Sequence, residues 1–591
     1  MPDLADLMTV VSRHAGRAPG AAAVRFFSGA GERRTEEVLT YGALDRSARA
    51  TAVALRERCV PGDRVLLPFP PGPGFAEAFL GCQYAGLVPV PVPVPARTSH
   101  QVDRTVSVAA DARPALVLTA AAALPDVRAR LDGQGLARLG AVAIETAREA
   151  DPDGWDAPPR VPDDLAFLQY TSGSTSDPKG VMVSHANLVH NLDLMRRSHG
   201  WDRDTRFCSW LPLHHDMGLI AMLLMPLYLG GTAAIMPATD FLKRPRTWLQ
   251  LMDETGAQVS CAPDFAYDLC ARRVTAEQAA ELDLSRWRQA CNGAEPVRAE
   301  TLRRFGERFA IAGFAPEAFL PGYGLAEATL YVSGAPAASA PVVTRVDAEA
   351  LRRDAFVPAD GGSASLVSSG HVRDLDVRIV DPATARTLPD GRVGEVWIRG
   401  GSVAQGYWMR PEETARAFGA VTSGGEGGFL RTGDLGVRQG TELYITGRLK
   451  EMLIVHGRNL YPHDIEREAE GLDEAFAGLA SCAFAVPAPR EEIVVVQEVR
   501  VRGLDAAEPS ALARRARTAL STRLGVAVGG FVLVRVGQVS RTTSGKIQRL
   551  RVRERFAEGA LRTVHEDLDA AVRDRYRPAV RRAAEPVRNP A

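Results

Sequence analysis

Lysine is almost missing from this chain of 591 residues. Of its 71 lysine and arginine residues, 67 are arginines and only four are lysines, at positions 179, 243, 450 and 546. Arginine spreads its charge over a planar fork, whereas lysine offers a compact and mobile point charge. A chain with this bias is expected to keep lysine mainly where a point charge is needed, so the four positions are candidates for functional residues.

Net charge is also missing, because 71 basic residues balance 71 acidic ones. Binding along a nucleic-acid backbone requires a basic surface, so nucleic acid is not expected as a main ligand. With 46% hydrophobic and 24% charged residues, the composition is that of an ordinary globular protein. The length predicts about four domains, or one large enzyme core with an appendage.

Cysteine is scarce as well. Seven cysteines are scattered along the chain, and no two have the CxxC spacing. This pattern indicates buried thiols in a reducing compartment and neither a disulfide framework nor a zinc site. The start of the chain carries Asp3 and Asp6, where a secretion signal would need basic residues. We therefore expect a cytoplasmic protein.

The longest run without charged residues lies at 217–239. On length alone it could span a bilayer. Pro226, Gly230 and Gly231 interrupt it, which favours a buried helix followed by a turn and a strand. No stable membrane insertion is expected.

The order of apolar and turn-forming segments predicts an α/β protein. Strand-then-helix units continue to about residue 335 and imply parallel sheets covered by helices. From about 366 to 446, short strands alternate with glycine-rich turns, which predicts a small barrel or distorted sheet. The α/β pattern then returns, so we place a domain boundary at about 447. The arginine- and proline-rich end, at 566–591, is expected to be a basic disordered tail.

The strongest local signal is the sequence YTSGSTSDPKG at 170–180. Hydroxyl groups and backbone N–H groups in a loop after a strand suit a polyphosphate, and Lys179 can reach a terminal phosphate. The loop differs from a Walker A motif, because Pro178 precedes the lysine and Gly180 follows it. Taken alone, the loop is equally well explained as a Ser/Gly turn without a ligand.

This loop resembles the phosphate loop of the adenylate-forming superfamily, which includes acyl-CoA synthetases, peptide-synthetase adenylation domains and luciferases. Six further segments of that superfamily follow in the expected order: LPLHHDMG at 211–218, NGAEP at 292–296, GYGLAEAT at 322–329, RTGDLG at 431–436, TGRLKE at 446–451 and TTSGKIQR at 542–549. The resemblance spans roughly residues 10–560. It implies a large N-terminal domain (1–446) with two βα-layered sheets and a β-barrel-like subdomain, and a small mobile α+β C-terminal domain (447–565).

The resemblance implies a site for ATP and Mg²⁺. Glu327 would hold Mg²⁺ against the ATP phosphates, a role that suits a hard carboxylate. Asp434 and Arg448 match residues that contact the ribose, and Tyr323 matches the residue that stacks on adenine. The nucleotide-binding set implied by the motifs is Thr171, Ser172, Gly173, Ser174, Thr175, Lys179, Gly293, Ala294, Glu295, Gly322, Tyr323, Gly324, Leu325, Ala326, Asp434, Ile445 and Arg448.

The catalytic residues implied by the same motifs are Lys546, Glu327, His215 and Asp216. Lys546 matches a lysine that bridges the acyl carboxylate and the α-phosphate, where positive charge stabilises the transition state. It lies 367 residues beyond Lys179, so only a mobile domain can bring it into the site. Lys450 matches the hinge about which that domain rotates.

Several segments resemble one branch of the superfamily, the fatty acyl-AMP ligases. The sequence SCAPDFAYDLC at 260–270 is similar to a segment that lines the acyl tunnel, with Asp264 where asparagine is usual. The sequence IVHGRNLYPHDIE at 454–466 is also similar to that branch. The stretch at about 335–362 resembles an insertion that sets the branch apart, although an ordinary surface loop would have the same length.

The branch activates a fatty acid to acyl-AMP, releases pyrophosphate, and passes the acyl group to an acyl carrier protein, here supplied in trans. Two alternatives remain: a long-chain acyl-CoA synthetase and a catalytically silent acyl-nucleotide-binding protein. Methionine-rich and apolar side chains can line a channel for flexible chains, although a plain core helix has the same composition. The acyl-binding residues expected are Met217, Ile220, Met222, Leu223, Met225, Phe265 and Tyr267.

Overall fold

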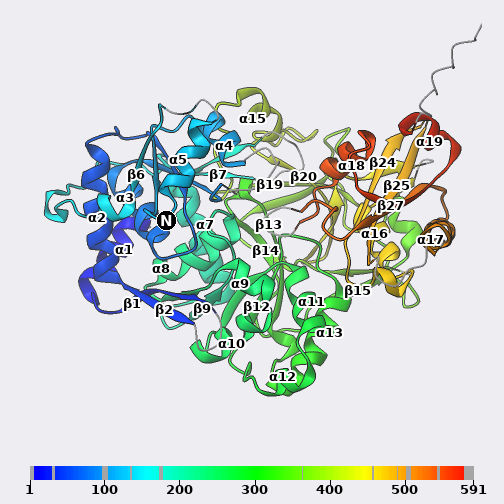
Figure 1. Cartoon of the computed structure of the whole chain (residues 1–591), viewed down its shortest axis with the longest axis horizontal. Coiled ribbons are helices and arrows are strands. Elements are labelled where there is room, and N and C mark those ends of the chain that lie inside the picture. The colour runs from blue at the N-terminus through cyan, green and yellow to red at the C-terminus, as the bar shows by residue number, and fades with distance from the viewer. Residues whose placement is uncertain are drawn as a thin grey trace, which may run out of the picture. The chain divides into compact units, whose positions relative to one another are not determined.

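A computed structural model describes residues 6–29, 34–95, 104–133, 136, 138–171, 178–362, 364–455, 458–488, 490–500, 508–541 and 546–577 (Figure 1). The chain divides into two compact units, one up to Thr446 and the other from Gly447. The first unit contains the two layered sheets and the β-rich region, and the second is a smaller α/β unit, as the sequence predicts.

The first sheet of the larger unit is parallel, with the order β4-β3-β5-β6. Its strands are β3 (Arg64–Pro68), β4 (Val88–Val92), β5 (Leu116–Thr119) and β6 (Gly140–Ala143). Strand β4 has the sequence VPVPV and lies at the edge, because alternate residues have no N–H for a second neighbour.

Helices cover this sheet: α2 (Tyr41–Arg56), α3 (Gly74–Ala85), α4 (Arg104–Ala112), α5 (Leu124–Asp132) and α6 (Ile144–Ala147). Helices α2 and α3 lie side by side (Figure 1). They approach so closely at Gly81 that an added Cβ atom would lie 2.5 Å from Thr51 Cγ2. The short helix α1 (Leu7–Arg17) packs on α2.

The second sheet has a parallel part that runs β13-β12-β11-β9-β10-β1, closed by the antiparallel strand β2. The bounds are β1 (Ala22–Ser28), β2 (Thr35–Thr40), β9 (Arg206–Ser209), β10 (Thr232–Ile235), β11 (Val259–Ala262), β12 (Gln289–Asn292) and β13 (Phe319–Gly324). Its helices include α7 (His185–His199), α9 (Ala238–Lys243), α10 (Arg246–Thr255), α11 (Asp264–Arg273), α12 (Ala276–Ala280) and α13 (Ala299–Phe309). All carboxyl ends of the parallel strands therefore lie at one edge of the sheet.

The charge-free run at 217–239 forms a buried helix, a turn and a strand, as predicted. A π-helix, Met217–Leu224, continues into α8 (Met225–Leu229) and ends at Gly230, where φ is +78° and glycine is favoured, before β10 begins. The π geometry was not expected from the sequence. Among the described residues, no helix is both long enough and apolar enough to cross a bilayer.

Antiparallel strands extend the sheet beyond β13. They are β14 (Tyr331–Gly334), β17 (His371–Val372), β18 (Asp376–Val380), β19 (Gly394–Arg399), β20 (Leu430–Gln439) and β21 (Glu442–Arg448). A hairpin of β7 (Leu165–Tyr170) and β8 (Gly180–Ser184) carries the phosphate loop, and α15 (Pro411–Ala417) follows β19.

The stretch at 335–362 is folded. It contains β15 (Val343–Val346), which pairs with β16 (Ala364–Val367), and the short helix α14 (Ala348–Leu351). Buried Phe356 packs on Tyr444 of β21 with ring centroids 4.8 Å apart, and the hydroxyl groups of Thr344 and Tyr444 are 2.8 Å apart. The stretch is therefore anchored on the β-rich part of the larger unit.

The second unit is built on the sheet β24-β25-β26-β27. Its strands are β22 (Leu453–Val455), β23 (Arg458–Leu460), β24 (Ser481–Pro487), β25 (Glu491–Val499), β26 (Val528–Arg535) and β27 (Thr563–Leu568), and its helices are α16 (Pro462–Glu470), α17 (Glu508–Leu524), α18 (Arg549–Ala557) and α19 (Ala570–Tyr576). Arg549 donates to both carboxylate oxygens of buried Glu466 at 2.7 Å and to Glu451 at 2.7 Å. This network ties α18 to α16 and to the turn at residue 451.

The prediction of a disordered tail from 566 onward is wrong in its start. Strand β27 pairs with β26, helix α19 buries Val572, and Arg577 donates to both oxygens of Glu566 at 2.7 and 2.8 Å. The arginine-rich composition concealed these apolar and paired positions. Residues 578–591 lie outside the described residues.

Candidate active site

Most of the motif residues of the larger unit follow the carboxyl ends of parallel strands. The segment 210–216 follows β9, Asp264 follows β11, Gly293 follows β12, and Glu327 follows β13. Ligand sites in open α/β sheets lie at this edge, because the loops from neighbouring strands meet there. The sheet thus gathers segments that are more than 100 residues apart in sequence.

Glu327 and Lys179 meet around one tyrosine. The hydroxyl group of Tyr407 donates to Glu327 Oε1 at 2.8 Å, and Lys179 Nζ lies 5.0 Å from the centre of the Tyr407 ring. Burial, and next the charge of Glu327, raise the pKa of Tyr407 well above its usual range, so this hydroxyl stays a donor. Lys179 also forms an ion pair with Glu413. The site therefore has a cation over the ring of a neutral tyrosine and a carboxylate at its hydroxyl group.

Tyr323 and Asp434 are joined directly. The tyrosine hydroxyl donates to Asp434 Oδ2 at 2.7 Å, although the two residues are 111 positions apart. Asp434 is buried, and its backbone N–H donates to Thr432 Oγ1 at 3.0 Å. Ile445 packs in the same apolar cluster as the Tyr323 ring. These three residues of the predicted nucleotide-binding set form one surface.

The turn that carries Asp434 is held by Glu395 on β19. Glu395 is almost fully buried and accepts from the Arg431 guanidinium at 2.8 and 3.0 Å. Its other oxygen accepts from the backbone N–H of Gly433 at 3.1 Å. Gly433 has φ of +71°, a conformation that favours glycine. Glu395 thus fixes the RTGD turn, although it lies outside every motif named above.

Asp264 links the predicted acyl-binding segment to the NGAEP segment. Its carboxylate accepts from Asn292 Nδ2 at 3.0 Å, from the Arg298 backbone N–H at 3.2 Å and from Thr301 Oγ1 at 2.8 Å. The neighbouring Phe265 N–H donates to Glu295 Oε1 at 2.6 Å. Two carboxylates thus clamp the start of α11 onto the loop after β12.

The electrostatics of this clamp are unusual. Asp264 is only 3% exposed, and burial, followed by the negative charge of Glu295, raises its pKa to about 7. Hydrogen bonds from Thr301 and Asn292 and the charge of Arg298 act in the opposite direction. Ala294, beside Glu295, has φ of +67°, a conformation that is rare for a residue with a side chain. The clamp therefore holds a strained loop at the predicted adenine-binding surface.

The HHD segment sits at the start of the π-helix. Burial lowers the pKa of His214 to about 3, so this side chain is neutral, and its carbonyl group accepts from Gln169 Nε2 at 3.0 Å. The rings of His214 and His215 are 4.5 Å apart. Asp216 accepts from the Met217 backbone N–H at 2.8 Å. Asp216 therefore has a structural role in starting the helix.

The predicted acyl-binding residues divide into two groups. Met217 and Phe265 are partly exposed, and the Phe265 ring lies 6.0 Å from Trp210. Ile220, Met222, Leu223 and Met225 are fully buried in the main core. Tyr267 is better explained as a core residue, because it packs among Trp248, Trp287 and Phe305 and its hydroxyl donates to the Cys291 carbonyl at 2.9 Å.

The two ends of the phosphate loop are hydrogen-bonded to each other. The Thr171 N–H donates to the Lys179 carbonyl at 3.2 Å, and Tyr170 pairs with Gly180. The Tyr170 hydroxyl donates to Asp111, 2.7 Å away. Ser172, Gly173, Ser174 and Thr175 lie outside the described residues.

Three predicted residues belong to the second unit. Arg448 ends β21, and Lys450 is exposed on the turn that follows. Lys546 is partly buried, next to a bridge between Arg541 and Ile547. The residues 542–545 just before it lie outside the described residues.

Comparison with known proteins decides the family. Residues 11–408 match the family model described as AMP-binding enzyme. The chain is 40% identical over 536 residues to the medium-chain-fatty-acid–[acyl-carrier-protein] ligase JamA of Moorena producens, covering 88% of this chain and 90% of the relative. The chain belongs to the AMP-binding enzymes.

Within the AMP-binding enzymes, its similar proteins include fatty acyl-AMP ligases. It is 39% identical over 539 residues to the long-chain-fatty-acid–AMP ligase FadD26 of Mycobacterium marinum, covering 88% of this chain and 91% of the relative. It also resembles the fatty acyl-adenylate ligase of L. pneumophila, solved with acyl adenylate and pyrophosphate, with a TM-score of 0.72 and 36% identity over 95% of this chain and 98% of that one. The predicted branch, fold class and ligase activity are confirmed.

For this fatty acyl-AMP ligase, sequence reasoning missed two residues that organise the site. Tyr407 lies outside the seven motifs, in a run that reads as an ordinary aromatic pair, GYWM. Glu395 had a usable signal, because it is a carboxylate inside the apolar strand GEVWI and must be paired if it is buried.

Proposed function

We propose that this chain activates a medium- or long-chain fatty acid with ATP and then passes the acyl group to an acyl carrier protein supplied in trans. The observation that carries the proposal is the meeting of Lys179, Tyr407 and Glu327 at the carboxyl edge of the sheet. The Tyr323–Asp434 pair lies on neighbouring segments and gives a surface for a nucleoside. The names of similar ligases support a fatty acid as the substrate.

In the first step, a fatty-acid carboxylate oxygen bonds to the α-phosphorus of ATP, and the bond to the bridging oxygen breaks to release pyrophosphate. Lys546 is assigned to the developing charge on the carboxylate and the α-phosphate, where a fixed cation is most effective. Lys179 is assigned to the leaving phosphates. His215 and Asp216 are assigned to the border of the reacting carboxylate.

Magnesium is assigned to Glu327. Among the described residues, no group of three His, Cys, Asp or Glu side chains is arranged to hold a metal ion. A magnesium ion that is bound mainly by ATP phosphates needs only one or two protein carboxylates, so the oxygen donors here fit it. When bound, the ion neutralises charge on the phosphates, and the Tyr407 hydroxyl orients the carboxylate that holds it.

In the second step, the phosphopantetheine thiol of the carrier, as thiolate, attacks the acyl carbonyl, and AMP leaves. Rotation of the smaller unit about Lys450 would separate the two steps. The anchored stretch at 335–362 is assigned to restraining this rotation so that CoA is a poor acceptor. The acyl-CoA synthetase alternative makes the opposite prediction for CoA. The silent-protein alternative is disfavoured by the joint presence of Glu327, Asp434, Arg448 and Lys546.

Laurate, ATP and Mg²⁺ should be given to the purified chain with either a holo acyl carrier protein or CoA at equal concentration. The proposal expects acyl-carrier product and little acyl-CoA. Efficient acyl-CoA formation would favour the acyl-CoA synthetase. Failure to form acyl-AMP with either acceptor would favour the silent protein.

A further inference from the structure

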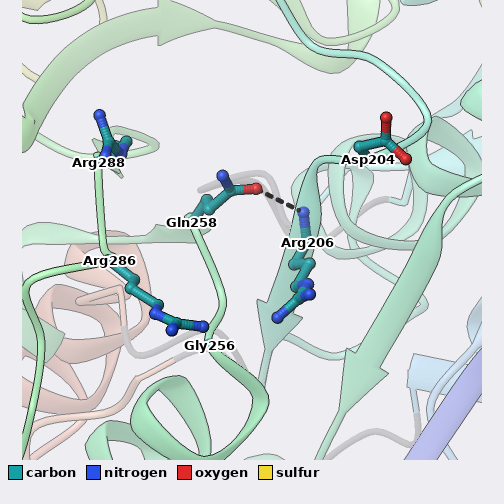
Figure 2. Close-up of a pocket in the computed structure, with 6 residues that line it drawn as sticks. All are labelled: Asp204, Arg206, Gly256, Gln258, Arg286 and Arg288. Carbon is teal, nitrogen blue, oxygen red and sulfur yellow. Dashed lines mark hydrogen bonds between the residues drawn. The ribbon is translucent and has the colours of Figure 1, made fainter.

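A positively charged cavity lies at the edge of the main sheet opposite the edge that carries the adenylation motifs. A cavity of about 270 Å³ is lined by Asp204, Arg206, Gly256, Gln258, Arg286 and Arg288 (Figure 2). Arg206 begins β9, Gln258 directly precedes β11, and Arg288 directly precedes β12. These three strands are parallel, so the cavity lies at their amino ends, whereas the adenylation motifs follow their carboxyl ends. Four residues of strand separate the two edges by about 13 Å.

Two guanidinium groups converge on one point of the cavity. An added Cβ atom on Gly256 would lie 3.0 Å from Arg206 Nη1 and 3.1 Å from Arg286 Nη1, so the two nitrogens are at most about 6 Å apart. Figure 2 shows both side chains extending toward Gly256. Two like charges at this separation repel each other, and a bound anion between them would remove that repulsion.

No acidic side chain of the described residues forms an ion pair with these two arginines, and the charge of Asp283 acts on Arg286 from outside the lining. Across the part of the chain that the structure describes, Arg206, Arg286 and Arg288 have no carboxylate within ion-pair distance. Asp204, the one acidic residue of the lining, lies 3.9 Å from Arg203, which is outside the lining. The cavity therefore keeps a net positive charge.

The backbone around the arginines is held in place. The Gln258 side chain accepts from the Arg206 backbone N–H at 3.1 Å, and its carbonyl accepts from the Arg288 N–H at 3.0 Å. Trp287, which separates Arg286 from Arg288 in the sequence, is buried among aromatic rings. The arginines on either side of it in the chain are both exposed. Gly256 caps α10 with φ of +58°. The guanidinium groups thus project from a fixed frame.

We propose that this cavity binds a phosphate-class anion between Arg206 and Arg286, with Arg288 at the rim. Guanidinium groups present paired donors that match phosphate oxygens, and such charge-assisted hydrogen bonds are among the strongest in proteins. The volume is below the 300–1,000 Å³ of pockets that enclose drug-sized ligands. The ligand is therefore inorganic phosphate or pyrophosphate, or the phosphate end of a larger molecule whose remainder stays outside.

Isothermal titration calorimetry at constant ionic strength tests the site with three probes: inorganic phosphate, inorganic pyrophosphate and glycerol 3-phosphate. Glycerol 3-phosphate binding as tightly as phosphate indicates a phosphomonoester ligand. A preference for pyrophosphate that Arg206→Gln abolishes indicates a free inorganic ligand, because pyrophosphate bound at the adenylation site does not depend on Arg206. Substituting either Arg206→Gln or Arg286→Gln should weaken phosphate binding by about 10-fold or more, the scale of one hydrogen bond to a charged group.

A charge-conserving variant separates a built site from diffuse positive charge. Arg206→Lys/Arg286→Lys keeps the charge and loses the paired donors, so it should still lose most of the phosphate affinity. The control Arg46→Gln/Arg58→Gln removes two exposed arginines elsewhere in the same unit and should leave binding unchanged.

Two results would overturn the site: native-like binding by the Lys/Lys variant, or no saturable phosphate binding by the native chain. Adenylate formation should stay within about twofold of native in the Lys/Lys variant, because the cavity lies about 13 Å from the adenylation edge. Adenylate formation and phosphate binding are measured separately, so a missing anion site can be distinguished from a missing ligase activity.

Discussion

The buried carboxyl group of Asp264 gives a prediction whose size follows from the structure. Burial and the nearby charge of Glu295 raise its pKa from 3.8 to about 7. Between these values the folded protein keeps the proton that the unfolded chain has already lost, so the native protein loses stability as the pH rises. The loss is about 2 kcal/mol from pH 5 to pH 7 and about 3 kcal/mol by pH 8, at no more than 1.36 kcal/mol per pH unit, and it levels off about one unit above the folded-state pKa.

Asp264→Asn removes this titration and keeps the packing. The asparagine oxygen can accept from Asn292 and from the Arg298 N–H, and its amide can donate to Thr301. The variant should therefore gain about 3 kcal/mol relative to the native chain between pH 5 and pH 8.

Urea unfolding of both proteins at pH 5 and pH 8, followed by tryptophan fluorescence, measures this difference. Asp268→Asn is the matched control, because Asp268 lies on the same helix and pairs with Arg272 at the surface. A stability difference between Asp264→Asn and native that is the same at both pH values would refute the reasoning.

Further predictions concern the site and the C-terminal end. Lys546→Ala should lower adenylate formation by about 10²- to 10³-fold, and unchanged hydroxamate-trapped acyl-AMP would remove its assigned role. Tyr407→Phe should lower the adenylation rate by about 10- to 100-fold and raise the Mg²⁺ concentration needed, since it loses a hydrogen bond to the Glu327 carboxylate; a Mg²⁺ titration identical to native would contradict this. Deleting 335–362 should increase acyl-CoA formation while acyl-AMP is still made, and an unchanged ratio of acyl-CoA to acyl-carrier product would count against the restraining role. Removing 566–577 should abolish the cooperative unfolding of the smaller unit, because β27 pairs with β26; a native-like melting curve would show that these residues are dispensable.

The sequence was sufficient for features that depend on local pattern. The run at 217–239 was predicted to fold as a helix, a turn and a strand because of its glycines and proline, and it does so. The edge position of β4 also has a local cause, because its alternate prolines have no N–H. The ordered motifs likewise predicted that Tyr323 and Asp434 belong to one site, and the structure joins them at 2.7 Å.

The features that were missed depend on tertiary contacts. Tyr407 becomes a site residue only because the fold brings it to Glu327, 80 positions away. Tyr267 shares a motif with Phe265, yet it turns into the aromatic core because its hydroxyl finds the Cys291 carbonyl there. The start of the tail was predicted too early because the prediction relied on arginine and proline content. Composition does not show that Val572 is buried in the smaller unit.

The most direct test of the central claim is mass spectrometry of the acyl-adenylates that the purified chain forms from ATP, Mg²⁺ and a mixed pool of short, medium and long fatty acids. Our account predicts acyl-AMP from medium- or long-chain acids, with one pyrophosphate released for each adenylate and about 10²- to 10³-fold less adenylate from Lys546→Ala. Absence of any fatty acyl-AMP while ATP and the folded chain are both present would contradict it.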